Sequence, residues 1–126
     1  MNNRQSPAER KKLLVPFDVT TDDGSERLGY LADLSETGLM FVTELSFEQW
    51  STFRLRIEVP QEGVDPDHLV ADVEVIWTRP NINPELTCVG CRFTDVPEGE
   101  LQRLLAVARE YAVGPEYDVH RVPPRD

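Results

Sequence analysis

A carboxylate, a hydroxyl and a glycine fall close together in the run Asp33-Leu34-Ser35-Glu36-Thr37-Gly38, called here the 33–38 turn. Asp and Ser side chains bond readily to nearby backbone, and glycine adopts the positive φ that a tight connection can require. The run is therefore explained as an ordinary turn between strands, with Gly38 at a positive-φ position. The same groups can also accept and donate hydrogen bonds to a polar ligand, so a binding role depends on a second feature of the chain.

That second feature is a basic cluster, Arg10, Lys11 and Lys12, in a chain of net charge -10. Residues 1–12 carry a net charge of +3, and the remaining residues carry -13. A solvated terminal arm that aids solubility explains the cluster. Alternatively, the cluster and the 33–38 turn together form a pocket for an anionic ligand. Both interpretations stay open from composition alone.

The overall composition is that of a globular protein. The chain has 126 residues, 40% of them hydrophobic and 29% charged, which suits one domain with a substantial core. No apolar run approaches the ~18 residues of a membrane helix, and the polar N-terminus does not resemble a signal peptide. We therefore expect a cytoplasmic protein without membrane insertion. The acidic balance argues against broad contact with DNA or an anionic membrane.

The two cysteines form the run Cys88-Val89-Gly90-Cys91. On a strand, residues three apart lie ~10 Å from each other on opposite faces, which is too far for a disulfide. A structural zinc site needs four ligands, and His68 and His120 show no partner spacing. The sequence predicts buried reduced thiols and no metal.

Hydrophobic alternation predicts a mainly β protein. The expected strands cover residues 13–21, 26–34, 39–43, 53–59, 69–79 and 86–94. Asp23-Gly24 predicts a hairpin turn between the first two strands, and Gly90 indicates a bulge or a close backbone approach. Residues 44–52 allow a short helical turn with Phe47 and Trp50 facing the same way.

A helix follows the strands. It carries one apolar stripe, and Gly114-Pro115 ends it. The stripe consists of Leu101, Leu104, Leu105, Ala108 and Ala112. We expect a flexible basic arm over residues 1–12, a domain over 13–113, and a disordered acidic, proline-containing tail over 114–126. The domain is expected to be a six-stranded antiparallel β-barrel with a C-terminal α-helix packed on it.

With its elements in this order, the chain resembles the PilZ domain family, bacterial receptors for the second messenger cyclic di-GMP. The 33–38 turn matches the family's DxSxxG motif at all three defined positions. Val75-Ile76-Trp77 in the fifth strand and Gly90-Cys91-Arg92-Phe93 in the sixth are also similar to the family, and the resemblance covers residues 9–112. In the family's other signature, RxxxR, Arg10 matches the first arginine, but Leu14 stands at the second.

The resemblance implies a ligand site for cyclic di-GMP, with no cofactor. It consists of Arg10, Lys11, Lys12, Asp33, Ser35, Gly38, Gly90 and Arg92. Arg10 would contact phosphate or stack on guanine, with the two lysines adding positive potential. Asp33 would accept from the guanine N1–H and N2–H edge, Ser35 would bond a phosphate or base atom, and Gly38 would let backbone approach the ligand. Gly90 and Arg92 would lie on the neighbouring strand, where Arg92 is equally explained as a surface arginine paired with a carboxylate.

Two functions remain open at this stage. The first is a cyclic di-GMP receptor that passes ligand binding to an unidentified protein partner. The second is a degenerate PilZ domain that does not bind the nucleotide and acts as a protein-interaction adaptor, which Leu14 favours because leucine offers neither charge nor a hydrogen-bonding fork. An enzyme is not expected, since the sequence has no nucleophile elbow, phosphate loop or metal cluster. The domain is expected to be a monomer or a weak homodimer.

Overall fold

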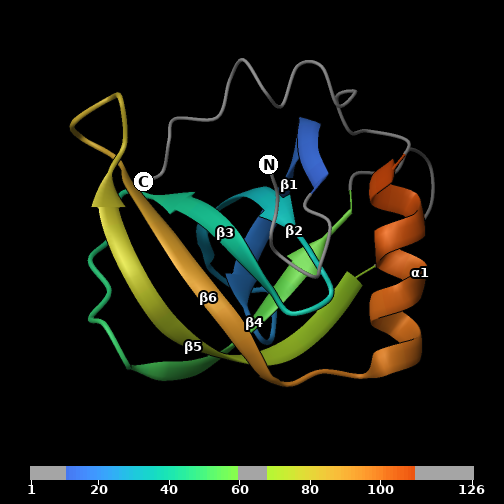
Figure 1. The fold of residues 1–126 in the computed structure, drawn as a ribbon. Helices are drawn as coiled ribbons and strands as arrows, with labels where there is room; N and C mark the ends of the chain where they lie inside the picture. The colour runs from blue at the N-terminus through green and yellow to red at the C-terminus, as the bar shows by residue number, and fades with distance from the viewer. Residues whose placement is uncertain (1–10, 60–67, 110–126) are drawn as a thin grey trace, which may run out of the picture.

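A computed structural model describes residues 11–59 and 68–109, with backbone only for residues 11–16. The fold is a closed antiparallel barrel with one helix beside it (Figure 1). Its elements are β1 (Lys11–Thr21), β2 (Arg27–Leu34), β3 (Gly38–Thr43), β4 (Thr52–Glu58), β5 (His68–Pro80), β6 (Thr87–Asp95) and α1 (Glu98–Arg109). The strand order around the barrel is β1-β2-β3-β6-β5-β4. The predicted six-stranded barrel with a C-terminal helix is confirmed.

The first strand begins earlier than expected. Lys11 and Lys12 belong to β1 because their backbones pair with Leu34 and Asp33 of β2. The pairing is then interrupted, and it resumes only at Phe17. Pro16 falls inside the interruption, as expected of a residue that cannot donate to a ladder. The arm at residues 1–10, Ala112, the Gly114-Pro115 helix end and the tail at 114–126 lie outside the described residues.

The core follows the predicted alternation. On β4, Leu55 and Ile57 are fully buried, whereas Arg54 is exposed and Arg56 is half-buried. On α1, the described part of the apolar stripe is buried as predicted: Leu101, Leu104, Leu105 and Ala108. The helix carries acidic residues in its first turn and Arg109 in its last, which suits the helix dipole. The stripe faces the barrel, since α1 contacts β1 and β5.

The short helical turn predicted between β3 and β4 is wrong. Residues 44–51 contain no helix. Instead, Trp50 N donates to Val75 O at 2.7 Å and Val75 N donates to Ser51 O at 2.9 Å, so the chain continues the β4–β5 pairing. Phe47 packs edge-on against Phe41 with ring centroids 5.3 Å apart, while Trp50 is 59% exposed. The two aromatic residues therefore do not face the same way.

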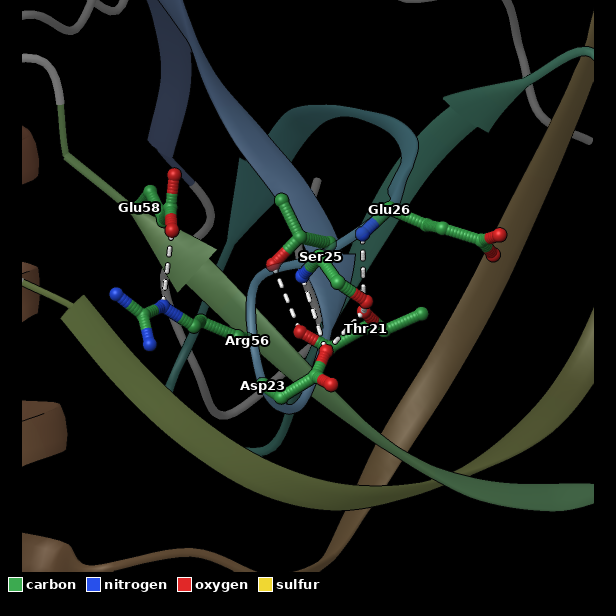
Figure 2. A network of polar contacts seen from close by, with 7 residues as sticks. Thr21, Asp23, Ser25, Glu26, Arg56 and Glu58 are labelled. Carbon is green, nitrogen blue, oxygen red and sulfur yellow. Dashed lines mark hydrogen bonds and ion pairs between the residues drawn. The ribbon is translucent and has the colours of Figure 1, made fainter.

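The predicted hairpin turn between β1 and β2 is present. Gly24 has a φ of 79°, the left-handed conformation that glycine tolerates. Figure 2 shows the hydrogen bonds that hold the turn: Asp23 Oδ1 accepts from Thr21 Oγ1 at 2.8 Å and from Ser25 N at 2.9 Å. The Ser25 backbone N–H is the main reason that the pKa of Asp23 is lowered to about 2. Beside the turn, Figure 2 also shows the β4 ion pair between Arg56 Nε and Glu58 Oε2 at 2.9 Å.

Candidate functional site

The hydroxyl of Ser35 holds the 33–38 turn together. Its oxygen accepts from Thr37 N at 3.2 Å and Gly38 N at 3.3 Å, and Ser35 N donates to Gly38 O at 2.9 Å. The residue is 1% exposed. These bonds are those expected of an ordinary side-chain-stabilised turn. The hydroxyl also lies 3.3 Å from Gly38 O, to which it can donate, and 3.2 Å from Thr37 Oγ1.

Gly38 is required for a reason other than the expected one. Among the described residues, positive φ occurs only at Trp50 and Gly24, so the positive φ predicted for Gly38 is wrong. A Cβ at Gly38 would instead lie 2.1 Å from the carbonyl oxygen of Cys91, inside the backbone of β6. Glycine is therefore required by the close approach of β3 to β6, which fixes the end of the turn against the next strand.

A bulge in β2 sets the direction of Asp33. Leu31 pairs with Phe41, but the next pair is Asp33 with Met40, which leaves Ala32 as an extra residue. Residues opposite each other on paired strands share a face of the sheet. Asp33 therefore shares the outer face with Met40, whereas Phe41 is buried in the core. Bulges commonly re-aim a side chain in this way. Asp33 is nevertheless 3% exposed, so other groups cover it on the outer face.

The register places three of the predicted site residues in one row across five strands. The row consists of Lys12 in β1, Asp33 in β2, Met40 in β3, Gly90 in β6 and Trp77 in β5. Its ends are four strand spacings apart, or about 19 Å, measured around the barrel surface through β2, β3 and β6, and β4 separates β1 from β5 on the other side. The backbones of Lys11 and Lys12 thus lie directly beside the 33–38 turn. Arg10 and the side chains of Lys11, Lys12 and Leu14 lie outside the part of the chain that the structure describes.

Trp77 is a site candidate that the sequence analysis missed. A Cβ at Gly90 would lie 2.2 Å from the Trp77 ring, so the indole lies across Gly90 on the outer face. The guanidinium carbon of Arg79 is 4.4 Å from the ring centroid, a cation–π contact. A bulge between Val75 and Trp77 sets this position. Gly90 thus lies opposite a bulge in the paired strand, which was one of the two predicted possibilities, and its close neighbour is the Trp77 side chain rather than the backbone. The pairing of Gly90 with Trp77 depends on the strand register, so the sequence carried no direct signal for it.

Arg92 lies two residues from Gly90 on β6, opposite Gly38 and Glu74. Its Nη2 is 2.7 Å from Glu74 Oε1, and its side chain is 58% exposed. This is the surface pair that one interpretation of Arg92 expects. The residue also borders an open depression of about 530 Å³ beside the 33–38 turn, whose lining includes Glu36, Asp95 and Glu98. The described rim is therefore acidic, and the guanidinium of Arg92 on it is paired with Glu74.

The thiols of the two cysteines are not part of the candidate site. Both are free, with Cys91 buried and Cys88 half-buried. Burial raises the pKa of the Cys91 thiol to about 12, so it stays protonated and unreactive. No group of three or more potential metal ligands occurs within residues 11–59 and 68–109.

Comparison with known proteins gives the family. A model of the PilZ domain matches residues 2–109. The chain belongs to the PilZ domain family. This PilZ domain places the DxSxxG residues at the β2–β3 connection. A search of curated proteins finds no match.

Solved structures agree on the fold. Inhibitor of motility (MotI/DgrA) from Bacillus subtilis is 17% identical with a TM-score of 0.68, covering 97% of this chain and 55% of that one. The PilZ domain of YcgR from Escherichia coli, solved with c-di-GMP, is 18% identical with a TM-score of 0.62, covering 94% of this chain and 99% of that one.

A structure of YcgR from Escherichia coli in complex with c-di-GMP is 20% identical with a TM-score of 0.64, covering 95% of this chain and 51% of that one. This PilZ domain thus spans about half the length of MotI and of that YcgR chain. Within the described ranges, it has no helix of the length and apolar character needed to cross a bilayer.

Proposed function

We propose that this PilZ domain is a receptor for cyclic di-GMP, without enzymatic activity, that binds the nucleotide on the outer face of the barrel. The observation that carries the proposal is the row in which the Lys12 backbone, Asp33, Gly90 and Trp77 lie side by side across neighbouring strands. The row places a basic segment, a carboxylate and an aromatic residue on the outer surface of the barrel, in β1, β2 and β5. Those are the groups that phosphates, a guanine edge and a base plane need.

Each part of the ligand has a partner in this arrangement. The Asp33 carboxylate would accept from the guanine N1–H and N2–H groups, and Trp77 with Arg79 would offer a surface for stacking. Arg10, Lys11 and Lys12 would neutralise phosphate charge. The Ser35 hydroxyl hydrogen would leave its long bond to Gly38 O for the ligand, and Arg92 would exchange Glu74 for a phosphate.

Access to Asp33 requires a conformational change. Because the residue is 3% exposed, a ligand contacts the carboxylate only after the groups that cover it move. A ligand that binds the uncovered state better shifts the population toward it. The basic segment is the part of the chain that can transmit such a change, since its backbone runs directly beside Asp33. The resulting surface would be the one that a protein partner detects.

Leu14 sets the expected affinity. A charged hydrogen bond contributes roughly 1.5–3 kcal/mol, and ~1.4 kcal/mol is tenfold in affinity. Leucine in place of the second arginine should therefore weaken binding about 10- to 100-fold relative to a complete RxxxR arm. Lys11 and Lys12 restore charge but not the bidentate geometry of arginine.

The adaptor function is the second candidate, favoured by two observations. Leu14 removes a phosphate ligand, and the described rim beside the 33–38 turn carries Glu36, Asp95 and Glu98. An acidic rim opposes a ligand with two phosphates. In this case, the domain would present the same barrel to a protein partner without the nucleotide.

Isothermal titration with cyclic di-GMP separates the two functions. We expect measurable binding to the unchanged protein, tighter binding to Leu14→Arg and weaker binding to Asp33→Ala. Asp18→Ala is the matched control, because Asp18 is an exposed carboxylate paired with Arg27 on β1 and β2. It should leave affinity unchanged. If Asp33→Ala does not fold, the affinity of Leu14→Arg still tests the receptor proposal. No heat at millimolar nucleotide in both the unchanged protein and Leu14→Arg would refute the receptor and leave the adaptor.

A further inference from the structure

The bulge in β5 decides which face of the barrel carries Trp77. Val75 is fully buried in the core, and Trp77 stands two residues further along the strand. In a regular strand, residues two apart share a face, so the indole would point into the core beside Val75. Ile76 is an extra residue, because the pairs on either side of it use consecutive residues of β6. The bulge therefore turns the indole to the outer face, across Gly90.

The same bulge turns the carbonyl of Ile76 toward Gln49. In a regular antiparallel strand, successive residues direct their backbone groups to alternate neighbours. Val75 faces residues 44–51, the connection between β3 and β4, so Ile76 would face β6 if the strand were regular. Its carbonyl oxygen instead accepts from Gln49 Nε2 at 2.9 Å. This bond therefore belongs to the bulged conformation and stabilises it relative to a regular strand.

The Ile76 carbonyl needs such a donor. A bulge leaves its extra residue outside the ladder of hydrogen bonds, and Ile76 is half-buried. Backbone carbonyls with limited access to water are almost always paired in native proteins, because an unpaired one is costly. The side-chain amide of Gln49 replaces the bond that β6 would have provided.

The connection between β3 and β4 holds Gln49 beside β5 (Figure 1). On one side of Gln49, Trp50 N donates to Val75 O at 2.7 Å, and Val75 N donates to Ser51 O at 2.9 Å. Ser51 Oγ donates to Glu48 O at 2.6 Å and closes the turn that contains Gln49. Within this turn, Trp50 has a φ of 74°, which bulky residues rarely adopt. Strain of this kind persists only where the surrounding contacts enforce it.

Trp77 is the part of the proposed nucleotide site that depends on this bulge. Its ring lies across Gly90, with the guanidinium carbon of Arg79 at 4.4 Å from the ring centroid. The bond between Gln49 and Ile76 is made without the nucleotide, so the indole already lies on the outer face before a base plane meets it. Less ordering is then required on binding.

We propose that Gln49 is a positioning residue for the nucleotide site. Its side-chain amide holds the carbonyl of Ile76 and thereby keeps Trp77 on the outer face of the barrel. The effect on nucleotide affinity rests on the proposed function. The position of the indole does not, so the two ideas can fail separately.

Gln49→Met tests the positioning, because it removes the amide donor and adds no charge. The measurement is the NMR signal of the Gly90 α-protons, one of which points at the indole and is shifted upfield by the current of the ring. We expect Trp77→Ala to abolish the upfield shift and Gln49→Met to move the signal clearly toward that of Trp77→Ala. Gln102→Met makes the same change on the exposed face of α1 and should leave the signal in place.

Isothermal titration with cyclic di-GMP gives the second measurement. Gln49→Met should weaken binding about two- to tenfold, the range of one neutral hydrogen bond, and should have no effect in a Trp77→Ala background. Equal effects in the two backgrounds, or Gly90 signals that stay in place in Gln49→Met, would overturn the proposal. If the Gly90 signals move as expected but the unchanged protein and Leu14→Arg bind no nucleotide, the receptor is refuted and Gln49 still positions Trp77.

Discussion

The connections at the two ends of β3 differ in how far their side chains contribute to the stability of the barrel. At the 33–38 turn, the groups that would contact a ligand also hold the barrel together: Ser35 is 1% exposed and bonds the turn, and Gly38 lets β3 meet β6. On the connections at residues 44–51 and 81–86, Leu45, Trp50 and Ile82 are exposed and absent from the hydrophobic core. Substitutions in the turn should therefore change folding and binding together, whereas removal of the exposed side chains of Leu45 and Ile82 should change stability little.

Gly38→Ala should have the largest effect of the substitutions considered. The new Cβ would lie 2.1 Å from the Cys91 carbonyl oxygen, and backbone cannot move aside as a side chain can. We expect a loss of about 3 kcal/mol or more in the free energy of unfolding, measured by urea denaturation.

Gly99→Ala is the matched control, because nothing lies within 4 Å of the added Cβ. It should leave stability unchanged or raise it by up to about 1 kcal/mol, as expected for alanine in a helix. Equal effects of the two alanines would show that β3 and β6 do not approach closely at Gly38.

Gly90→Ala tests the aromatic part of the same region. The Cβ would meet the Trp77 ring at 2.2 Å, so the indole must move, and we expect a loss of about 1–3 kcal/mol in unfolding free energy. Because the clash is with a side chain, Trp77→Ala should remove most of the additional cost of Gly90→Ala. A double-mutant cycle by urea denaturation measures this coupling. Additive effects would mean that the indole does not lie across Gly90.

Trp50, in the connection between β3 and β4, supplies the contrasting test. Replacement by alanine or glycine removes the same side chain, but only glycine adopts a φ of 74° without strain. We expect Trp50→Gly to be more stable than Trp50→Ala by about 1 kcal/mol. This order reverses the usual preference for alanine. Thermal unfolding of the two variants measures it, and an alanine variant as stable as the glycine variant would remove the argument from strain.

The acid limb of the stability profile should depend on Asp23 in the β1–β2 turn. Hydrogen bonds from Ser25 and Thr21 lower the pKa of Asp23 from 3.8 to about 2. The folded state therefore favours the ionised carboxylate, and this contribution is present above about pH 4 and is lost as the pH falls toward 2. Melting temperatures of Asp23→Asn should fall less steeply over this range. An identical slope in both proteins would contradict the assignment.

The sequence predicted the positions of the strands and the helix better than it predicted which side chains lie on the outer face of the barrel. Alternation located the strands, and the helical stripe was correct at Leu101, Leu104, Leu105 and Ala108. It could not reveal the bulges at Ala32 and beside Trp77, which decide that Asp33 and Trp77 share the outer face. Bulges arise from pairing between strands, and one strand's pattern does not encode its partner's register.

Two residues of the candidate site show what could not be predicted there from the sequence. Gly38 was assigned to the turn for a positive φ, but the structure requires glycine there because of the backbone of β6, which is distant in sequence. Arg92 was left between two roles because its pairing with Glu74 depends on the register of β5 and β6. At residues 44–52, spacing compatible with a helix was overridden by pairing with β5.

The most direct test of the receptor proposal is a titration of cyclic di-GMP followed by backbone amide shifts. We expect shifts at residues 11–12, 33–38, 77–79 and 90–92, with a shift of the Trp77 indole and none at residues 44–51 or 81–86. No shift at millimolar nucleotide, or shifts at residues 44–51 or 81–86 alone, would contradict the receptor proposal.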